Sequence, residues 1–451
     1  MFTPLRTSCA VGLALGCILA GPAPARAGGP PAVLRMRDRV AAVNRILSQR
    51  LERLLPALMR ETGFDMWIIA TNEDNLDPVF RTMIPYDTWT PITQLLVFYD
   101  PGGGREIEKL NLSRTNTRGF YKDGWDWRAW DAEKKESQWD YLARVVRERN
   151  PKVIGVNEGE VQWAAGGLTV PLKKSLVAAL GPQLSTRLQS AELLATRWLE
   201  TLLDEEIEIY GQVVALAHAV LADTMSNKAI TPGVSTTDDM NYYYWQRLAD
   251  LGLEFSFMPN CTIRGRGPEE TQKFGKDDRT IRRGDLLHCD VGLKYLRYNS
   301  DHQELAYVLR PGEVDAPDSF KQGMAEANRL QDAFVSEFKA GLTGDQLLGN
   351  ILATARGKGI RKPRVYSHSI GYYLHEPGPL IGLPWEQVRN TGRGDVTLVD
   401  NSCFTAEMSV DFPIAEWGGR EVRFALEQDV VFTKGRAVFV DGRQTAFHLV
   451  R

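Results

Sequence analysis

Residues Leu286–Leu309 of this chain read LLHCDVGLKYLRYNSDHQELAYVL. The stretch contains two apolar runs joined by a short polar segment, which predicts two β-strands in a hairpin. Each predicted strand carries one aspartate, and a turn centred between Tyr295 and Leu296 sets Asp290 directly opposite Asp301. Like charges at facing positions of neighbouring strands are destabilising. The hairpin therefore predicts a bound cation, unless one aspartate simply ends a strand or caps a turn.

A second pair of apolar runs with the same character lies near the C-terminus. Cys403–Phe412 (CFTAEMSVDF) and Glu421–Thr433 (EVRFALEQDVVFT) are separated by a segment with two adjacent glycines, which supply turn chemistry. A turn centred on Trp417 places Glu407 opposite Glu427, because each is ten residues away. Burying ionised carboxylates without partners is costly. The repetition of a facing acidic pair favours one or two divalent ions over the alternative of strand ends and turn caps.

Two histidines lie between the predicted hairpins, in the segment Tyr366–Glu376 (YSHSIGYYLHE), at His368 and His375. An imidazole that joins oxygen ligands suits manganese, zinc, cobalt or iron better than calcium or magnesium. The residue types therefore predict a transition-metal site.

The five residues Asp290, Asp301, His368, Glu407 and Glu427, in this order, resemble the dinuclear metal site of the pita-bread metallopeptidases, the group of methionine aminopeptidase, aminopeptidase P and prolidase. The chain is most similar to the aminopeptidase P and prolidase branch, because a separate N-terminal domain precedes the catalytic half. The resemblance implies an α/β (α+β) protein, with an N-terminal creatinase-like α/β domain at residues 28–190 and a pita-bread catalytic domain at residues 191–451.

The resemblance also assigns roles to the site residues. It implies that Asp290 binds one metal, that His368 and Glu407 bind the other, and that Asp301 and Glu427 bridge the two. Two close ions lower the pKa of a shared water and polarise a substrate carbonyl. By the same resemblance Glu407 accepts the proton of that water, and His375 contacts the substrate near the scissile bond. We expect two divalent ions, with manganese first and zinc, cobalt or iron as alternatives.

Several positions depart from the family pattern. Arg264 stands about where the family has a substrate-binding histidine, and Arg364 replaces a second histidine four residues before His368. Met408 follows Glu407 where the family usually has proline. These changes leave a requirement for proline in the substrate open. Each arginine is expected either to pair with a substrate carboxylate or to be an ordinary surface charge.

The sequence thus predicts a metallopeptidase that hydrolyses short peptides from the amino end, similar to Xaa-Pro aminopeptidase or prolidase. Two alternatives stay open at this stage. One is a non-catalytic peptide-binding or scaffold protein of the same fold, which the missing histidines allow. The other is a creatinase-like C–N hydrolase, although creatinase works without this metal set. By analogy with the family, a homodimer is expected.

The first 27 residues predict a secretory signal peptide. Arg6 supplies the positive charge, Ala10–Ala20 the apolar core, and Ala25–Ala27 a cleavage site of small residues. Cys17 does not follow the pattern of a lipid attachment site, so a lipid anchor is not expected, and the apolar core is too short for a membrane span. We therefore expect a secreted or periplasmic protein.

Charge and cysteine content narrow the partners further. The formal net charge is only -3 and no basic run stands out, which argues against binding to nucleic acid. Beyond the predicted signal peptide only Cys261, Cys289 and Cys403 remain, and this odd, sparse set argues against a disulfide framework. We expect Cys289 and Cys403, which lie near the proposed ligands, to be buried structural cysteines.

Overall fold

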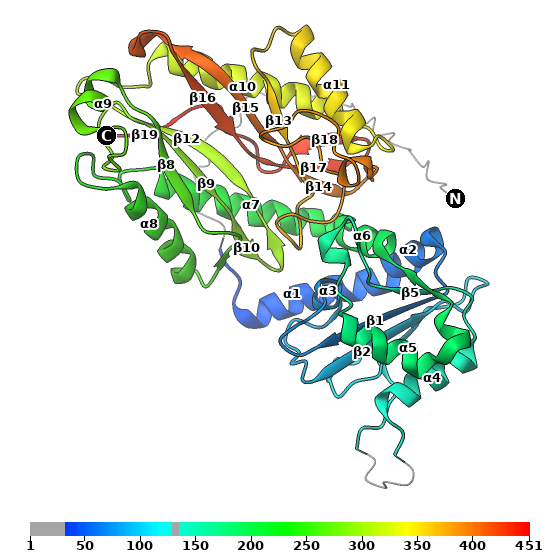
Figure 1. Cartoon of the computed structure of the whole chain (residues 1–451). Helices are drawn as coiled ribbons and strands as arrows, with labels where there is room; N and C mark the ends of the chain where they lie inside the picture. Colours follow the sequence, from blue (N-terminus) through cyan, green and yellow to red (C-terminus); the bar gives the residue numbers. More distant parts are fainter. Residues whose placement is uncertain (1–31, 129–134) are drawn as a thin grey trace, which may run out of the picture.

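The computed structural model describes residues 32–128 and 135–451. Figure 1 shows an N-terminal α/β domain beside a larger domain formed by the rest of the chain, which confirms the predicted fold class. The predicted signal peptide, with Cys17, lies outside the described residues. None of the helices within the two described ranges combines the length and the apolarity needed to cross a membrane.

The N-terminal domain is organised around strand β1, Met66–Asn72. Its sequence MWIIATN is buried on both faces, as expected for the interior of a sheet covered on both sides. The strand order is β4-β3-β2-β1-β5-β6, antiparallel between β1 and β2 and parallel between β1 and β5. The other strands are β2 (Thr93–Tyr99), β3 (Glu108–Asn111), β4 (Lys122–Asp123), β5 (Ile154–Val156) and β6 (Leu188–Ser190). The helices are α3 (Pro78–Met83), α4 (Gln138–Arg149), the short η2 (Trp163–Ala165) and α5 (Val170–Ser185).

A buried arginine joins the N-terminal domain to the larger one. The helical segment that enters the molecule consists of α1 (Met36–Gln49), the π-helical turn η1 (Arg50–Leu54) and α2 (Leu55–Thr62). The Arg50 guanidinium donates to the carboxylate of Glu206 at 2.8 Å, and both side chains are buried. Glu206 also accepts from the hydroxyls of Tyr298 at 2.6 Å and Tyr372 at 2.8 Å. Because each charge has several partners, this joint is expected to hold the two domains together.

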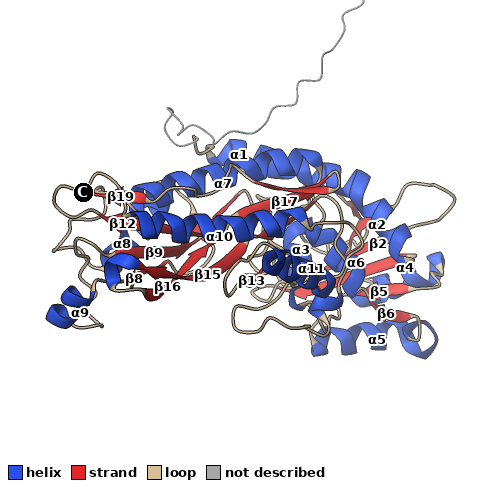
Figure 2. Cartoon of the chain, turned by 90° about the horizontal axis from the view of Figure 1, so that it is seen from above, coloured by secondary structure: helices blue, strands red, loops and turns tan. Residues whose placement is uncertain are grey.

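In the larger domain, helices surround a set of mainly antiparallel sheets. The helices are α6 (Glu192–Glu200), α7 (Asp204–Thr224), α8 (Thr237–Asp250), α9 (Pro268–Phe274), α10 (Asp318–Ser336), α11 (Gly344–Gly357), η3 (Arg393–Asp395) and η4 (Ala415–Trp417). The strands are β7 (Glu254–Phe255), β8 (Asn260–Gly265), β9 (Leu286–Val291), β10 (Leu293–Tyr295), β11 (Tyr298–Asn299), β12 (His302–Val308), β13 (Arg364–Tyr366), β14 (Ser402–Thr405), β15 (Glu407–Ile414), β16 (Arg420–Leu426), β17 (Asp429–Thr433), β18 (Arg436–Phe439) and β19 (His448–Val450). Two sheets position the site, β19-β12-β9-β8 and β13-β15-β16. Helix α10 packs along β15 and β16 (Figure 2).

The first predicted hairpin forms, but its register differs from the prediction. Leu296 and Arg297 both have positive φ, 51° and 76°, as in a type I′ turn, so the turn is centred between them. Asp290 therefore pairs with Gln303, and the predicted facing position of Asp301 is wrong. Side chains alternate along a strand. Because Asp301 lies two residues from Gln303, the two aspartates still face the same side and line one cavity.

The second predicted hairpin has the predicted register. Strands β15 and β16 pair from Met408 with Leu426 to Ile414 with Arg420. The same register, continued by one residue, places Glu407 opposite Glu427. The turn centred on Trp417 is therefore confirmed.

A disulfide links the neighbouring strands β8 and β9, where Cys261 and Cys289 are paired in register. The expectation that these cysteines carry no disulfide is wrong for this pair. Their separation of 28 residues has no recognisable spacing, and only the pairing of the two strands brings the sulfur atoms together. Cys403 is free and buried, as predicted.

Candidate metal centre

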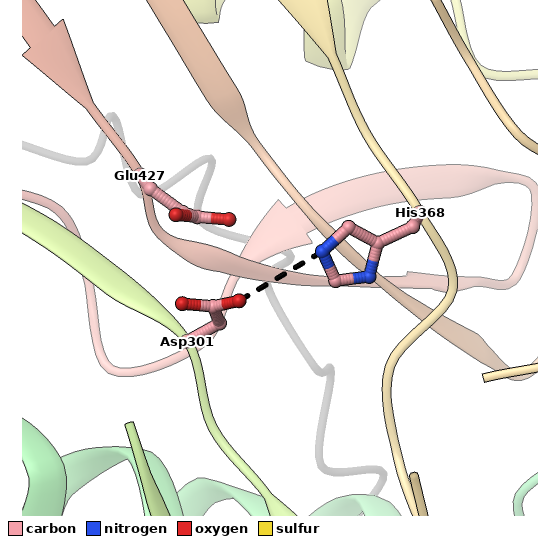
Figure 3. A group of neighbouring side chains, drawn as sticks. All are labelled: Asp301, His368 and Glu427. Carbon is pink, nitrogen blue, oxygen red and sulfur yellow. Dashed lines mark ion pairs between the residues drawn. The ribbon is translucent and has the colours of Figure 1, made fainter. Parts of the chain in front are cut away.

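Three of the predicted ligands form a compact group where strands end (Figure 3). Asp301 precedes β12, His368 follows β13 and Glu427 follows β16. Each residue offers one ligand atom, and these atoms all lie within 4.8 Å of one another. His368 Nε2 lies 3.8 Å from Asp301 Oδ2. Separations of this size leave room for an ion between the side chains.

The hydrogen bonding of His368 presents the correct nitrogen to this group. Its Nδ1 lies 3.0 Å from the carbonyl oxygen of Ser369. A carbonyl only accepts hydrogen bonds, so Nδ1 carries the proton and the Nε2 lone pair faces Asp301. Burial, reinforced by nearby His375, lowers the pKa of His368 to about 3. The imidazole is therefore neutral at physiological pH, the form that binds metals.

The four carboxylates are electrostatically unsatisfied without a cation. Burial raises the pKa of Asp290 to about 6 and that of Glu407 to about 7. Burial and the surrounding acidic groups raise the pKa of Asp301 and Glu427 well above the usual range. Asp301 Oδ1 and Glu427 Oε1 are buried and have no hydrogen-bond partner among the described residues. Orphaned acidic oxygens beside a neutral imidazole fit the ligand set of a divalent transition metal.

All five predicted ligands line one cavity of about 310 Å³. Its lining residues are Phe257, Asp290, Asp301, Gln303, Tyr366, His368, Leu374, His375, Glu407 and Glu427. Asp290 and Glu407 lie on the cavity wall outside the compact group of three. The predicted substrate contact His375 packs edge to face against His368, with ring centroids 4.5 Å apart. The sequence prediction therefore identified the residues that meet here.

Gln303 is a site residue that the sequence analysis missed. Its Nε2 donates to Glu427 Oε2 at 2.7 Å, and its Oε1 lies 3.0 Å from His288 Nε2. The same side chain also bonds Glu407 and lowers the pKa of that carboxyl against the effect of burial. A neutral amide gives no metal-ligand pattern in the sequence. Only the shifted hairpin register, which pairs it with Asp290, reveals its position.

Arg393 is a second residue that the sequence did not indicate. It lies in η3 with its guanidinium 5.2 Å from the ring centroid of Trp163, a residue of the N-terminal domain. Its positive charge contributes to the lowered pKa values of His368 and His375, after burial. The N-terminal domain therefore reaches the neighbourhood of the cavity through this contact.

The predicted substrate residues Arg264 and Arg364 lie beside the cavity rather than in it. They line a second cavity of about 140 Å³, which shares Gln303, Tyr366 and Glu407 with the first. Arg364 forms an ion pair with Asp411 at 3.1 Å. The shared wall makes the second cavity a side chamber of the metal centre, and we refer to it below as the arginine chamber.

Comparison with known proteins places this geometry in context. The model of metallopeptidase family M24 matches residues 208–434, half of the chain. The fold is similar to that of X-Pro aminopeptidase from Thermotoga maritima, with a TM-score of 0.60 and 18% identity over 87% of this chain and 100% of that one. It is also similar to Xaa-Pro dipeptidase from Bacillus anthracis, with a TM-score of 0.57 and 17% identity over 92% of this chain and 100% of that one. A search of curated proteins gave no match.

Proposed function

The chain belongs to metallopeptidase family M24, and on that premise we propose that it is a dinuclear-metal peptidase that removes residues from the amino end of short peptides, in the manner of Xaa-Pro aminopeptidases and prolidases. The observation that carries the proposal is the convergence of four carboxylates and a neutral imidazole in one cavity. Neither a scaffold nor a creatinase-like hydrolase needs this set. Both alternatives are therefore less well supported.

The five residues fit a pair of divalent ions. Asp290 would hold one ion, His368 and Glu407 the other, and Asp301 and Glu427 both, since Asp301 and Glu427 each have an orphaned oxygen. When bound, such ions lower the pKa of a water toward neutrality and polarise a substrate carbonyl. Manganese is the first choice, with zinc, cobalt or iron as alternatives.

The protein's own side chains complete the chemistry. Glu407, whose pKa burial raises to about 7, is suited to accept and return a proton near neutral pH. His375 lines the same cavity and is exposed, so it can hydrogen-bond a substrate carbonyl or amide. Gln303 holds the Glu427 carboxylate in position through its 2.7 Å hydrogen bond. Proton transfer and orientation are thus assigned to different residues.

A peptide screen tests the proposed activity. Purified protein supplied with Mn²⁺ is incubated with tri- and tetrapeptides that carry proline or another residue at position two, and products are identified by mass spectrometry. We expect release of the first residue and no cleavage of amino-terminally acetylated peptides. Internal cleavage, or equal turnover of acetylated peptides, would contradict action from the amino end.

We further propose that the protein is exported and acts as a homodimer. The disulfide between Cys261 and Cys289 supports an oxidising compartment, where such bonds persist. The dimer is inferred only from analogy with related enzymes. N-terminal sequencing of exported protein should give a start near Gly28, and light scattering should give twice the chain mass.

A further inference from the structure

The metal centre and the arginine chamber share one face of the sheet β13-β15-β16. Tyr366 pairs with Glu407, and Arg364 pairs with Ser409 two residues further along. Side chains two residues apart on a strand point to the same face, about 6.7 Å apart. The carboxylate row therefore continues directly into a row that carries arginine.

The next row on this face is also charged. Asp411 of β15 pairs with Arg423 of β16. In the row that carries Arg364, Ser409 also pairs with Ala425, and these small side chains leave space for the chamber. A substrate whose scissile carbonyl lies at Glu407 would reach this space with its adjacent residue, because one extended residue spans about 3.3 to 3.6 Å and a side chain adds to that reach.

Arg264 enters the chamber from β8 without a counter-ion. Its side chain makes no hydrogen bond or ion pair with any residue in the described ranges, and its Nε is buried. Burial and the neighbouring Arg423 lower its pKa, and Asp290 opposes this shift. A guanidinium whose Nε is buried without a partner costs free energy, which a bound anion recovers.

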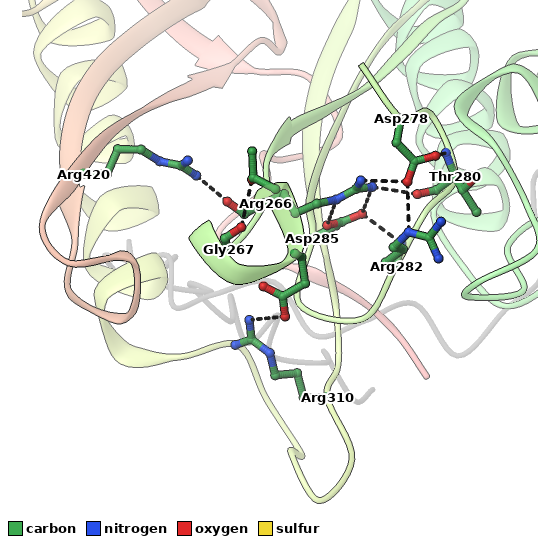
Figure 4. Close-up of polar contacts among 10 residues, drawn as sticks. Arg266, Gly267, Asp278, Thr280, Arg282, Asp285, Arg310 and Arg420 are labelled. Carbon is green, nitrogen blue, oxygen red and sulfur yellow. Dashed lines mark hydrogen bonds and ion pairs between the residues drawn. The ribbon is translucent and has the colours of Figure 1, made fainter. Parts of the chain in front are cut away.

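The neighbouring Arg266, in contrast, has the ion-pair partners expected of a structural arginine (Figure 4). It makes a bidentate contact with Asp285 at 2.8 Å and a further ion pair with Asp278 at 2.9 Å. Arg264 lies in β8 and Arg266 directly follows this strand, and both line a larger cavity of about 560 Å³. Of the two, only Arg264 lacks a partner, so its charge does not hold this part of the chain in place.

The charges that line the chamber do not balance. Arg364 and Arg423 share one carboxylate, Asp411, at 3.1 and 3.4 Å. Together with the unpaired Arg264, this makes three guanidinium groups and one carboxylate, Asp411, at this end of the sheet face. Glu407 also borders the chamber, but it belongs to the proposed metal ligands.

We propose that the arginine chamber binds a carboxylate of the substrate, carried by the residue that follows the scissile bond. Arg264 is the main contact, and Arg364 and Arg423 set the positive field. The charged amino end of a peptide is repelled by three guanidinium groups, so the following residue faces them. The inference rests on the proposed peptidase function and specifies its substrates as short acidic peptides. Two sources supply such a carboxylate, the free C-terminus of a dipeptide and an aspartate or glutamate side chain.

Matched peptides separate the two sources. The first pair is Ala-Ala and Ala-Ala-amide, which differ only in the terminal carboxylate. The second pair is Ala-Asp-amide and Ala-Asn-amide, which differ only in the side-chain carboxylate. We expect kcat/KM to be about 10- to 100-fold higher for the charged member of at least one pair, and Arg264→Gln to remove that preference, since hydrogen bonds to charged groups have this strength. The preferred pair identifies the source.

Control variants make the result specific. Arg356→Gln removes a positive charge from the exposed end of helix α11 and should leave both ratios unchanged. Arg264→Lys should retain part of the preference. Arg423→Gln alters a half-exposed side chain and should reduce the preference by a smaller factor than Arg264→Gln. It provides the test if Arg264→Gln does not fold. Equal kcat/KM for charged and neutral members, in the wild type, would overturn the inference.

A binding measurement distinguishes failure of the chamber from failure of the peptidase. Succinate, a dicarboxylate, is titrated calorimetrically into metal-loaded wild type and Arg264→Gln of equal metal content. We expect at least tenfold weaker binding by the variant and no change for Arg356→Gln. This result would support the chamber even if no peptide were hydrolysed. Equal binding by wild type and Arg264→Gln would overturn it, whatever the peptidase activity.

Discussion

The two ends of one sheet face differ in charge and in the work we assign to them. At one end Glu407 and Glu427 line a cavity with His368, and one oxygen of Glu427 is left unsatisfied. At the other end Arg364 and Arg423 share Asp411, with Arg264 left unpaired. A negative charge without a partner favours binding of a cation, and a positive charge without a partner favours binding of an anion. We assign catalysis to the carboxylate end and substrate selection to the arginine end. Substitutions at the two ends should therefore change peptidase activity in different ways.

The largest effect is expected from Glu407→Ala, at the carboxylate end. The substitution deletes a proposed metal ligand and the proposed general base together, so turnover should fall by more than about 10⁴-fold for every peptide. Initial rates on charged and neutral peptides provide the measurement. A loss of turnover confined to acidic peptides would show that Glu407 selects the substrate. It would contradict the assignment of catalysis and substrate selection to different ends of the sheet face.

His375→Ala should have the next largest effect. His375 lines the metal cavity but does not belong to the compact group of ligand atoms, so metal content should stay unchanged. We expect kcat to fall about 10²- to 10⁴-fold, the usual contribution of a residue that transfers a proton or stabilises a carbonyl. Elemental analysis is the control. Loss of metal together with activity would show that His375 is a ligand.

Metal removal should have a smaller effect, on stability, with a defined dependence on pH. Asp290 and Glu407 have folded-state pKa values of about 6 and about 7, above the values of about 4 for unfolded chains. Without metal, the folded protein therefore binds more protons between pH 4 and 7. The stability that these groups contribute is present below pH 4 and is lost as the pH rises through 6 and 7.

Melting curves at two pH values measure this pH-dependent contribution to stability. We expect the metal-free protein to melt at a lower temperature at pH 8 than at pH 5, and Mn²⁺ to raise the melting temperature more at pH 8, where the carboxylates are ionised. Glu407→Gln should reduce the difference between the two pH values. An equal gain at both pH values would contradict shared ligation by buried carboxylates.

The two hairpins show how far the sequence determined the site. In the β15–β16 hairpin Gly418 and Gly419 have positive φ, 67° and 81°, and these glycines mark the turn in the sequence. The register and the facing pair of glutamates were therefore predictable. In the first hairpin Leu296 and Arg297 occupy the positive-φ positions. Neither leucine nor arginine is typical of such a turn, so the predicted turn centre was one residue too early.

Other parts of the site depend on tertiary contacts that no local pattern encodes. The five proposed ligands could be singled out because carboxylates and histidines in apolar strands are conspicuous. Gln303 became part of the site only through the corrected register. Arg423 reached the chamber through its pairing with Asp411 across the sheet. The disulfide formed because Cys261 and Cys289 are register partners on adjacent strands, which their sequence spacing does not show.

Metal stoichiometry, measured together with activity, tests the central claim most directly. Chelated protein is titrated with Mn²⁺ while bound metal per chain and peptide hydrolysis are both recorded, for wild type and for Glu427→Gln. The account predicts that wild-type activity saturates at two ions per chain, and that Glu427→Gln, which loses a bridging carboxylate, binds fewer ions and stays inactive. Full peptidase activity in the chelated wild type, with no metal bound, would contradict it.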